Sequence, residues 1–475
     1  MDIFTTNTNQ LIVNRKDFLS LSTKAAVFLG LSSAISCKNE IEEKTISLSN
    51  SKAKGTAFGL TAPKIDKVKV GIIGCGNRGQ VLIQMFDWLV KNNDAEIIAV
   101  SDLRKEKTDK LNEHLQKTHN KTAQAYYGNP NEWKKLVDRD DIDLLIIATP
   151  WELHTPMAIY GMEKGKHVAC EVPIAYNLED CWKIIETAER TQKHCMMMEN
   201  CCFNGEELWV LNMINQGVFG DLTHAEGAYI HDLRKHLLDE KYYEDQWRIK
   251  HHLNKDGNFY TTHGLGPISQ YMDIGRGDTY DHVVSMSSRE KSLSDAAKRA
   301  GINKFSNVKC GDMNTTMIKT KLGKSIMLQF DVHSGRPYDR LNTVVGTKAV
   351  HEGYPSKLYI NEDELAWWGH KWLEKEKYNE YREKYNHPLW DKLKTQISDN
   401  SVGHGGMDFV MIYRLIKCLN KGLPLDINVY DSVLWSSITP LSELSVAQNS
   451  SSIKVPDFTG GTWKNKNTTE MLRNI

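Results

Sequence analysis

The sequence lacks the motifs of the common nucleophile-dependent and metal-dependent hydrolases. It contains no G-x-S-x-G, no H-E-x-x-H, no C-x-x-C and no other paired His/Cys spacing. These absences argue against serine-type catalysis and against a metal site, so we predict no metal ligands. His251 and His252 are adjacent, and in an extended segment their side chains would face opposite ways and could not readily share one ion.

The sequence also has no charge bias and no disulfide pattern. Among its 475 residues, 60 are Lys or Arg and 60 are Asp or Glu, so no electrostatic field attracts the chain to nucleic acid or to an anionic membrane. The nine cysteines do not form a framework of spaced pairs, and we interpret Cys201 and Cys202 as small buried apolar residues. The length suits two domains with additional segments.

No apolar run is long enough to span a bilayer, but the N-terminus resembles an export signal. Basic residues and Phe-Leu at 15–19 precede a short apolar run at 25–35. This order resembles a twin-arginine signal with Lys16 in place of the second arginine, a route that exports folded, cofactor-loaded proteins. Residues 34–37 also resemble a lipoprotein cleavage box, which would make Cys37 a lipid-modified N-terminus.

We therefore predict an export signal at residues 1–37 and a linker at 38–64, because the latter stretch is rich in Lys, Ser, Glu and Thr. The expected location is exported, periplasmic or lipid-anchored at a bacterial cell envelope. A disordered leader on a cytoplasmic protein is the alternative.

A glycine-rich turn is the most informative feature that is present. The β-branched run at 68–73 ends in Gly74-x-Gly76-x-x-Gly79, an amphipathic stretch follows, and a second apolar run leads to Asp102. In a dinucleotide site the first glycine allows the tight turn, the second admits the pyrophosphate, and the third lets the helix pack on the strand. Asp102 lies 23 residues beyond Gly79, where an acid favours NAD over NADP.

Residues 65–198 alternate short apolar runs with helical periodicity, which predicts an α/β Rossmann domain with a parallel sheet. Further strands are expected at 143–149, 167–171 and 195–198. Ligands bind beyond the carboxyl ends of such strands. The residues that follow these strands are therefore candidates for binding: Trp151, Glu152, Leu153, His154, Glu171, Val172, Glu199 and Asn200.

Residues 199–475 have a different pattern. Strands are expected at 222–230, 315–318 and 325–332, whereas helical periodicity appears at 407–419 and 432–447. Strands grouped apart from helices predict an α+β domain with a mostly antiparallel sheet. The aromatic-rich stretch 367–390 is interpreted as a surface helical excursion.

Polar and aromatic residues gather in a few places of this second domain. Each place has an ordinary structural explanation when taken alone, such as an aromatic ring at a strand end or a structural histidine. The places are Glu199-Asn200, Tyr229 to Asp232, Trp247-Arg248, Tyr260 to Gly264, Arg336 to Tyr338, and Gly403 to Gly406.

With these blocks in view, the chain from about residue 66 to the end resembles the Gfo/Idh/MocA oxidoreductase family and, within it, glycoside hydrolase family 109. The resemblance rests on spaced motifs: Gly76-Asn77-Arg78-Gly79-Gln80, Pro150 to His154, Glu199-Asn200-Cys201, His231 to Arg234, Tyr260 to Pro267, Gly403 to Asp408 and Ser437 to Ser442. It implies an NAD-dependent glycosidase that acts on terminal N-acetylgalactosaminides. The α-anomer is the first expectation, and the sequence leaves the β-anomer open.

Two departures from the dehydrogenase pattern favour the glycosidase. The E-K-P motif has Val172 in place of its lysine, and the aspartate of the D-x-x-x-H pair is missing before His263. A third departure, Val402 in the G-G-H-G-G loop, weakens the assignment of His404. A sugar or polyol dehydrogenase is the alternative, and a non-catalytic NAD-binding regulator is a third reading.

The resemblance implies a redox-neutral cycle in which NAD⁺ takes hydride from C3, a base removes the C2 proton, the C1 group leaves, water adds and hydride returns. It implies catalytic roles for His263, Tyr260, His404, Tyr338 and Tyr229. Tyr229, Tyr260, His263, Tyr338, Arg248 and Glu199 would bind the sugar. The NAD contacts would be Gly74, Gly76, Asn77, Arg78, Gly79, Asp102, Trp151, Glu152, Leu153, His154, Glu171, Val172, Asn200 and Trp247. The expected partner is a glycan with terminal N-acetylgalactosamine, and the sequence allows a homodimer.

Overall fold

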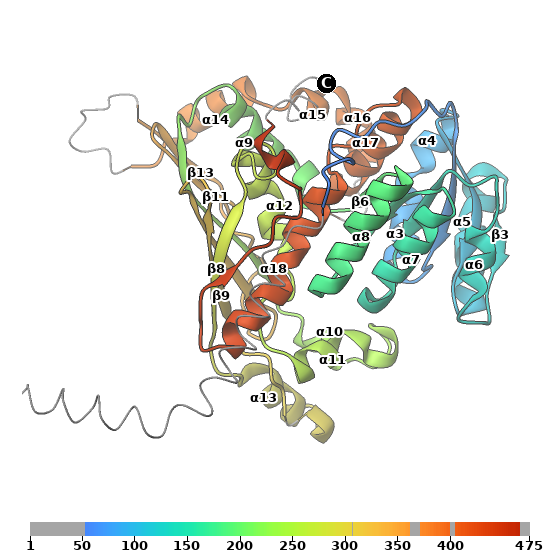
Figure 1. Cartoon of the computed structure of the whole chain (residues 1–475), viewed down its shortest axis with the longest axis horizontal. Helices are drawn as coiled ribbons and strands as arrows, with labels where there is room; N and C mark the ends of the chain where they lie inside the picture. Colours follow the sequence, from blue (N-terminus) through green and yellow to red (C-terminus); the bar gives the residue numbers. More distant parts are fainter. Residues whose placement is uncertain (1–52, 306, 362–370, 400–403, 466–475) are drawn as a thin grey trace, which may run out of the picture. The chain divides into compact units, whose positions relative to one another are not determined.

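The computed structural model describes residues 53–305, 307–361, 371–399 and 404–465 (Figure 1). The predicted export signal, including Cys37, the first part of the predicted linker and Val402 lie outside the described residues. No helix in the described ranges combines the length and apolar character needed to cross a membrane.

The first half of the described chain forms a six-stranded sheet, sheet A, in the order β3-β2-β1-β4-β5-β6 with every pair parallel. This order defines the doubly wound dinucleotide-binding fold and confirms the predicted α/β domain. The strands are β1 (Val68–Ile73), β2 (Ala95–Ser101), β3 (Gln124–Tyr126), β4 (Leu144–Ile147), β5 (His167–Cys170) and β6 (Cys195–Met197).

Helices cover sheet A, so its central strands are buried on both faces and are apolar at almost every position. All four residues of β4 and of β5 are buried, as the continuous apolar runs predicted. The helices are α3 (Asn77–Met85), α4 (Asp87–Lys91), α5 (Lys105–His119), α6 (Glu132–Val137), α7 (Trp151–Glu163) and α8 (Leu178–Thr191).

The second half forms an eight-stranded sheet, sheet B, in the order β13-β12-β11-β7-β10-β9-β8-β14. Only its β7–β10 pair is parallel among the described strands, so the mostly antiparallel sheet is confirmed. The strands are β7 (Leu222–Ile230), β8 (Tyr280–Ser287), β9 (Asn314–Thr320), β10 (Ser325–Asp331), β11 (Thr343–Gly346), β12 (Ala349–Glu352), β13 (Lys357–Ile360) and β14 (Ile453–Lys454).

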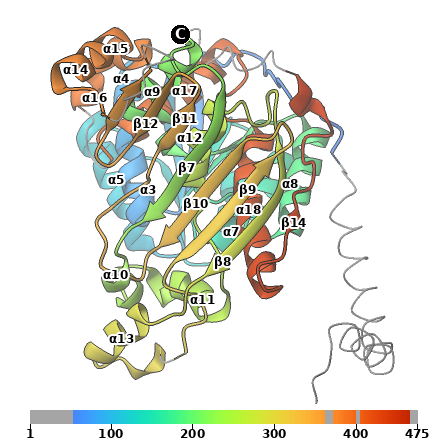
Figure 2. The same ribbon diagram turned by 90° about the vertical axis from the view of Figure 1, so that its left-hand side faces the viewer.

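Helices α12 (Thr262–Tyr271) and α18 (Val429–Ala447) lie between the two sheets in Figure 1. Figure 2 looks onto the other face of strands β7 to β10, which no described helix covers in this view. Helix α18 packs on β8 of sheet B and also on α8 of the first domain, and α17 (Met407–Lys421) packs against α3.

The other helices of the second sheet's half of the chain are α9 (Gly205–Asn215), α10 (Arg234–Leu238), α11 (Trp247–Asn254), α13 (Ser292–Arg299), α14 (Lys375–Lys384), α15 (Pro388–Lys392) and α16 (Lys394–Asp399). The short 3₁₀ turns are η1 (Asn200–Phe203), η2 (Glu244–Gln246), η3 (Asn303–Phe305) and η4 (Thr462–Lys464).

Two segments are more deeply packed than the sequence indicated. Residues 53–64, in the predicted linker, lie against the body: the Gly55 amide donates to Glu189 at 2.6 Å, and the Ala57 amide donates to the Tyr430 hydroxyl at 3.0 Å. The predicted helical excursion contains a helix at Lys375–Lys384 and the start of another at Pro388–Lys392, but it is not confined to the surface, because the Trp390 indole donates to the Phe203 carbonyl at 3.0 Å. Residues 367–370 of that excursion lie outside the described residues.

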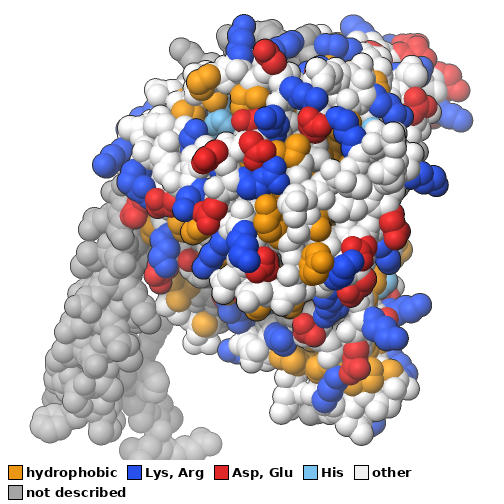
Figure 3. Space-filling view, turned by 90° about the vertical axis from the view of Figure 1, so that its right-hand side faces the viewer, with side chains coloured by type: hydrophobic (Ala, Val, Ile, Leu, Met, Phe, Trp, Pro, Cys, Tyr) orange, Lys and Arg blue, Asp and Glu red, His pale blue; other side chains and the backbone are white. Residues whose placement is uncertain are grey.

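The eight cysteines of the described residues are free and buried, and they include Cys201 and Cys202 as predicted. On the face that Figure 3 presents, lysine and arginine side chains are interspersed with aspartate and glutamate. This distribution agrees with the balanced charge of the sequence.

Candidate active site

The glycine-rich turn joins β1 to α3. Gly74 has a φ of +93°, and a Cβ there would lie 2.4 Å from the Ala148 carbonyl oxygen. A Cβ on Gly79 would lie 2.1 Å from the Gly74 carbonyl oxygen, so only glycine lets the helix start this close to the turn. By contrast, a Cβ on Gly76 would meet nothing within 4 Å. The turn therefore leaves open space at the N-terminus of α3, where a pyrophosphate would be stabilised.

Asp102 follows β2 and supports this turn. Its Oδ2 accepts a hydrogen bond from the Cys75 amide at 2.8 Å, and its Oδ1 accepts one from the Arg104 amide at 3.0 Å. Each carboxylate oxygen has further acceptor capacity, so Asp102 can still receive ribose hydroxyls. Its contact with NAD stays a prediction.

A buried carboxylate, Asp408, gathers three residues that the sequence assigned separately. Arg78 donates to it through Nη1 at 2.8 Å and Nη2 at 2.9 Å, Asn200 donates at 2.7 Å, and His404 Nδ1 lies 2.9 Å from Oδ2. Burial disfavours ionisation of Asp408, but Arg78 and His404 outweigh it and hold the pKa of the carboxyl well below its ordinary value. Arg78 also donates to Glu171 at 2.6 Å.

This Asp408 network places His404 at the edge of the nucleotide domain. Helix α17 begins at Met407 and packs on α3, whose first turn carries Arg78, so one carboxylate links the histidine loop to the glycine turn. His404 is half exposed, whereas Asp408 is buried. The sequence analysis included Asp408 in the motif Gly403 to Asp408 but gave it no role, because His404 lies in the turn before α17 and no helix spacing indicates their contact.

Glu199 and His263 form the second polar centre. His263 Nδ1 lies 2.7 Å from Oε1 and 2.9 Å from Oε2 of Glu199, which is fully buried. Burial raises the pKa of Glu199, but the neighbouring His263 and the hydrogen bonds to the carboxylate lower it further, so the net pKa is below its ordinary value. Because Nδ1 is bonded to the carboxylate, Nε2 is the nitrogen that can exchange a proton with a substrate.

Two predicted tyrosines, Tyr229 and Tyr260, pack on His263, and the third, Tyr338, packs on Tyr229. Tyr229 and Tyr260 are stacked with ring centroids 4.3 Å apart, and the Tyr260 ring lies 4.8 Å from that of His263. Tyr338 meets Tyr229 edge-on at 6.3 Å and is 38% exposed. Burial raises the pKa of Tyr229 to about 12, and it raises the pKa of Tyr260 as well. At neutral pH these phenols therefore carry their protons and donate hydrogen bonds.

Aromatic rings surround the side chain of Arg248, next to these tyrosines. Its guanidinium carbon is 5.2 Å from the Trp151 ring centroid and 5.0 Å from that of Tyr260. Its Nη1 donates to the Tyr243 hydroxyl at 2.9 Å, while its buried Nε has no partner in the part of the chain that the structure describes. The ring centroids of Trp151 and Trp247 lie 5.3 Å apart, so both predicted tryptophans belong to this aromatic cluster around Arg248. A buried donor without a partner is what a bound polar ligand would satisfy.

The other predicted cofactor residues have mixed surroundings. His154 is buried, and its two ring nitrogens each lie 2.7 Å from a backbone carbonyl, of Pro173 and Thr149. Val172 is buried and offers no proton donor or acceptor. Leu153 is exposed, and Asn77 donates to the Tyr242 carbonyl at 3.2 Å. Their contacts with NAD stay predictions.

The extended segment assumed for the adjacent histidines was wrong, although their rings do face different partners, as expected. His251 and His252 lie on helix α11 and not in an extended segment. His251 Nε2 is 3.1 Å from Glu152 Oε1, which lowers the pKa of that carboxyl. His252 Nδ1 instead lies 2.9 Å from His333 Nε2. Alternation along a strand does not apply to a helix, where neighbours are separated by about 100° around the axis.

The parallel sheet of order 3-2-1-4-5-6, its glycine turn and the attached antiparallel domain define a two-domain protein with an NAD-binding Rossmann domain. Residues 68–199 match the model of the "Oxidoreductase family, NAD-binding Rossmann fold", and residues 203–465 match the "Glycosyl hydrolase 109, C-terminal domain". The chain belongs to glycosyl hydrolase family 109.

Curated relatives agree with this assignment. The chain is 44% identical over 414 residues to an alpha-N-acetylgalactosaminidase of Shewanella oneidensis, covering 86% of this chain and 89% of that protein. It is also 44% identical over 415 residues to a glycosyl hydrolase family 109 protein of Shewanella sp. (strain ANA-3), with the same coverage.

Solved structures share the fold at lower identity. A levoglucosan dehydrogenase in complex with NADH and L-sorbose has a TM-score of 0.61 and 18% identity, over 82% of this chain and all of that one. An NAD binding oxidoreductase from Klebsiella pneumoniae has a TM-score of 0.61 and 16% identity, over 82% of this chain and 99% of that one. These likenesses show the fold.

Proposed function

We propose that the chain hydrolyses terminal N-acetylgalactosaminides, the α-anomer first, with NAD as a bound and recycled cofactor. The observation that carries the proposal is the Glu199–His263 pair beside Tyr260, together with an apolar Val172 where dehydrogenases of the superfamily keep a lysine. The site thus has a group for removing a proton from carbon but lacks that lysine relay. The name of the Shewanella oneidensis relative supports the substrate class.

NAD, when bound, supplies reversible hydride transfer at the sugar, and the protein supplies orientation and proton exchange. The residues present fit this cofactor, because the glycine turn leaves open space beside Gly76 and Asp102 stands at the end of the adjacent strand. No proton donor or acceptor comes from Val172.

His263 is assigned as the base that removes the proton next to the oxidised carbon. Ionised Glu199 holds its Nδ1, fixes the tautomer and stabilises the imidazolium that forms. The protonated hydroxyls of Tyr260 and Tyr229 orient and hydrogen-bond the sugar, because burial raises the pKa of both phenols. Tyr338, at the exposed edge of the same cluster, is assigned to sugar binding.

His404 is assigned as the general acid and base for the leaving group and the attacking water. It is half exposed and is held by Asp408, so it can exchange protons with solvent while keeping its orientation. Arg248 is assigned to the sugar because none of the described residues pairs with its buried Nε.

The experiment is a released-product assay with p-nitrophenyl α-N-acetylgalactosaminide and no added NAD. We expect aglycone release without net formation of NADH, since each hydride returns to the sugar. The second candidate, a sugar or polyol dehydrogenase, is favoured only by the shared fold. It requires added NAD⁺ and net NADH formation with a free sugar, and this result without any glycosidase activity would overturn the proposal.

We also propose that residues 1–37 direct export to the cell envelope, with Cys37 as a lipid attachment site. The proposal rests on the order of basic, Phe-Leu, apolar and small residues in the sequence. Labelling with a radioactive fatty acid, comparing the native sequence with Cys37→Ser, tests it. Label in both proteins or in neither overturns the lipid anchor.

A further inference from the structure

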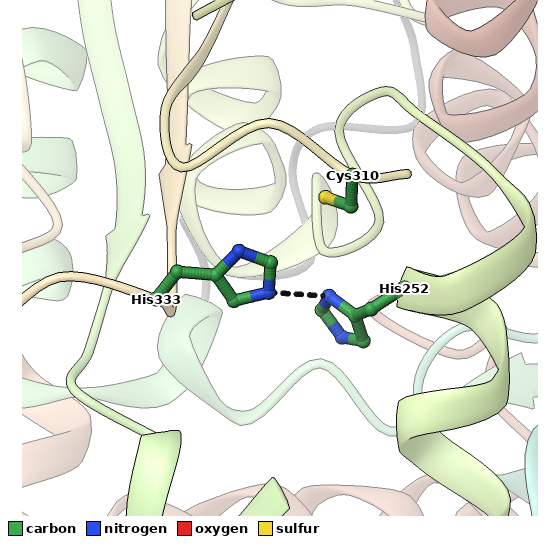
Figure 4. Close-up of side chains that lie close together, drawn as sticks. All are labelled: His252, Cys310 and His333. Atoms are coloured by element: carbon green, nitrogen blue, oxygen red, sulfur yellow. Dashed lines mark hydrogen bonds between the residues drawn. The ribbon is translucent and has the colours of Figure 1, made fainter. Parts of the chain in front are cut away.

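We propose that His252, Cys310 and His333 form a binding site for a zinc-class metal ion. One ligand atom from each of these side chains lies within 4.8 Å of the other two, and all three residues are buried. Figure 4 shows the sulfur of Cys310 pointing toward the two facing imidazoles, which a hydrogen bond joins. The cluster is separate from the glycosidase residues assigned above.

The three residues come from distant segments that the backbone brings together. His252 lies on α11, His333 follows β10, and Cys310 lies in the segment before β9. The amide of Cys310 donates to the His252 carbonyl at 2.9 Å, which places the thiol beside that imidazole. The His333 amide donates to Asp331 at 3.1 Å and thereby directs the turn after β10 toward the same point.

The hydrogen bond between the imidazoles leaves the cluster incompletely satisfied. A neutral imidazole has one donor and one acceptor nitrogen. The 2.9 Å bond between His333 Nε2 and His252 Nδ1 uses one of each. Among the described residues, no group lies within hydrogen-bond distance of the outer nitrogens, His252 Nε2 and His333 Nδ1. A metal ion between the rings takes the lone pairs of both inner nitrogens, so each outer nitrogen carries a proton.

Asp312 then completes the arrangement around His333. Its Oδ1 lies 3.8 Å from His333 Nδ1, on the side of the ring away from His252. Metal-bound histidines usually direct their second N–H to a carboxylate or carbonyl, which orients the ring and raises its basicity. We therefore assign Asp312 as the positioning residue of the site.

The donor set selects the metal. Two imidazoles and one thiolate suit zinc, which prefers tetrahedral nitrogen and sulfur ligands, and they do not suit magnesium or calcium. Two zinc-bound nitrogens lie about 3.3 Å apart at normal bond lengths, so the rings must separate by a few tenths of an ångström. The thiol of Cys310 loses its proton to solvent on binding. Water can fill the fourth position.

The surroundings indicate a structural role for the ion. Phe259 and Phe330 pack on the His252 ring at 5.2 and 6.2 Å, so the site lies in an apolar layer. Helix α11 carries both His252 and Arg248, so an ion bound here would fix the helix that presents Arg248 to the proposed sugar site.

The test uses the full, tag-free chain, stripped with a chelator and then equilibrated with Zn²⁺ or Co²⁺ alone. We expect about one zinc ion per chain, and a thiolate-to-cobalt charge-transfer band with tetrahedral d–d bands when cobalt replaces zinc. Substoichiometric zinc, or a cobalt complex without the thiolate band, would overturn the site. This readout needs no variant and no enzymatic activity.

Variants then locate the ion. Cys310→Ser should lose the thiolate band and bind zinc at least about tenfold more weakly, and Asp312→Asn should weaken binding by about 10–100-fold. Cys181→Ser, which changes a buried cysteine of α8, is the matched control and should bind like the unchanged chain. Unchanged affinity in Cys310→Ser, or equal loss in Cys181→Ser, contradicts the assignment.

Discussion

Two clusters built from similar residue types lie close together in this chain, and we assign them different chemistry. Glu199, Cys201 and His263 form one, and His252, Cys310 and His333 form the other. Two consecutive residues pack on the two clusters. The ring centroid of Tyr260 lies 4.8 Å from that of His263, and the ring centroid of Phe259 lies 5.2 Å from that of His252.

Their surroundings differ in two respects. The side chain of His263 is bonded to a carboxylate and is 12% exposed. Those of His252 and His333 have no exposed surface, and within the described residues their rings hydrogen-bond only to each other. A histidine with a charged orienting partner and access to a ligand can transfer protons. Buried imidazoles facing a thiol suit an ion instead. The residue types are therefore less informative than their partners and their exposure.

The largest expected effect is a loss of kcat, and it distinguishes the proposed catalytic cluster from the proposed zinc cluster. His263→Gln should lower kcat by about 10²–10⁴-fold, the usual contribution of a general base, with zinc binding unchanged. His333→Gln should do the reverse and abolish zinc binding while lowering kcat far less. Steady-state kinetics and metal content measured on both variants check this. Equal loss of kcat in the two variants would mean that the clusters act as one site.

The second effect concerns the carboxylate that holds His404. Asp408→Asn leaves Arg78 with Glu171 alone, and we expect a loss of about 3 kcal/mol in the free energy of unfolding, as for a broken buried ion pair. Asp141→Asn, at the exposed Arg139 pair, is the matched control and should cost less than about 1 kcal/mol. Urea unfolding of both variants measures the difference, and equal costs would show that Asp408 is not a central contact.

A smaller effect on kcat/KM is expected from removing one hydroxyl group that is assigned to sugar binding. Tyr229→Phe keeps the stacked ring but removes a hydroxyl that lies 3.1 Å from His231 Nδ1. We expect kcat/KM to fall about fivefold to tenfold, which corresponds to one hydrogen bond. If the loss approached that of His263→Gln, Tyr229 and not His263 would be the base.

The smallest effect is a dependence of stability on pH. The pKa of Asp408 and that of Glu199 are below their ordinary values in the folded chain. Their stabilisation is therefore complete above the unfolded values, near pH 4, and is lost as pH falls through the lower folded values. The free energy of unfolding should decline below about pH 5. Asp408→Asn should show a shallower decline, and an unchanged slope would contradict its role.

Much of the fold could be predicted because it depends on local patterns. The apolar runs at 144–147 and 167–170 and the glycine turn at Gly74 each specify a strand or a turn within a few residues. The mostly antiparallel character of the second sheet and three of its eight described strands, β7, β9 and β10, were also predicted, whereas β8 and β11 to β14 were not.

The candidate site was predicted in part, and the missing part depends on long-range packing. The tyrosines, His263 and Glu199 were identified, and the structure brings them together. The contact of Asp408 with Arg78 spans 330 residues, and His252 and His333 are 81 residues apart, so no spacing rule could indicate either. Both depend on how α17 and α11 pack in the folded chain.

The most direct test of the central claim is hydrolysis of an α-N-acetylgalactosaminide in D₂O, followed by analysis of the released sugar at C2. In the proposed cycle, hydride passes from C3 to NAD⁺ and later back, and between these steps a base removes the C2 proton. We therefore predict deuterium at C2 of the product and no net formation of NADH. A released sugar that keeps its C2 proton would contradict the account.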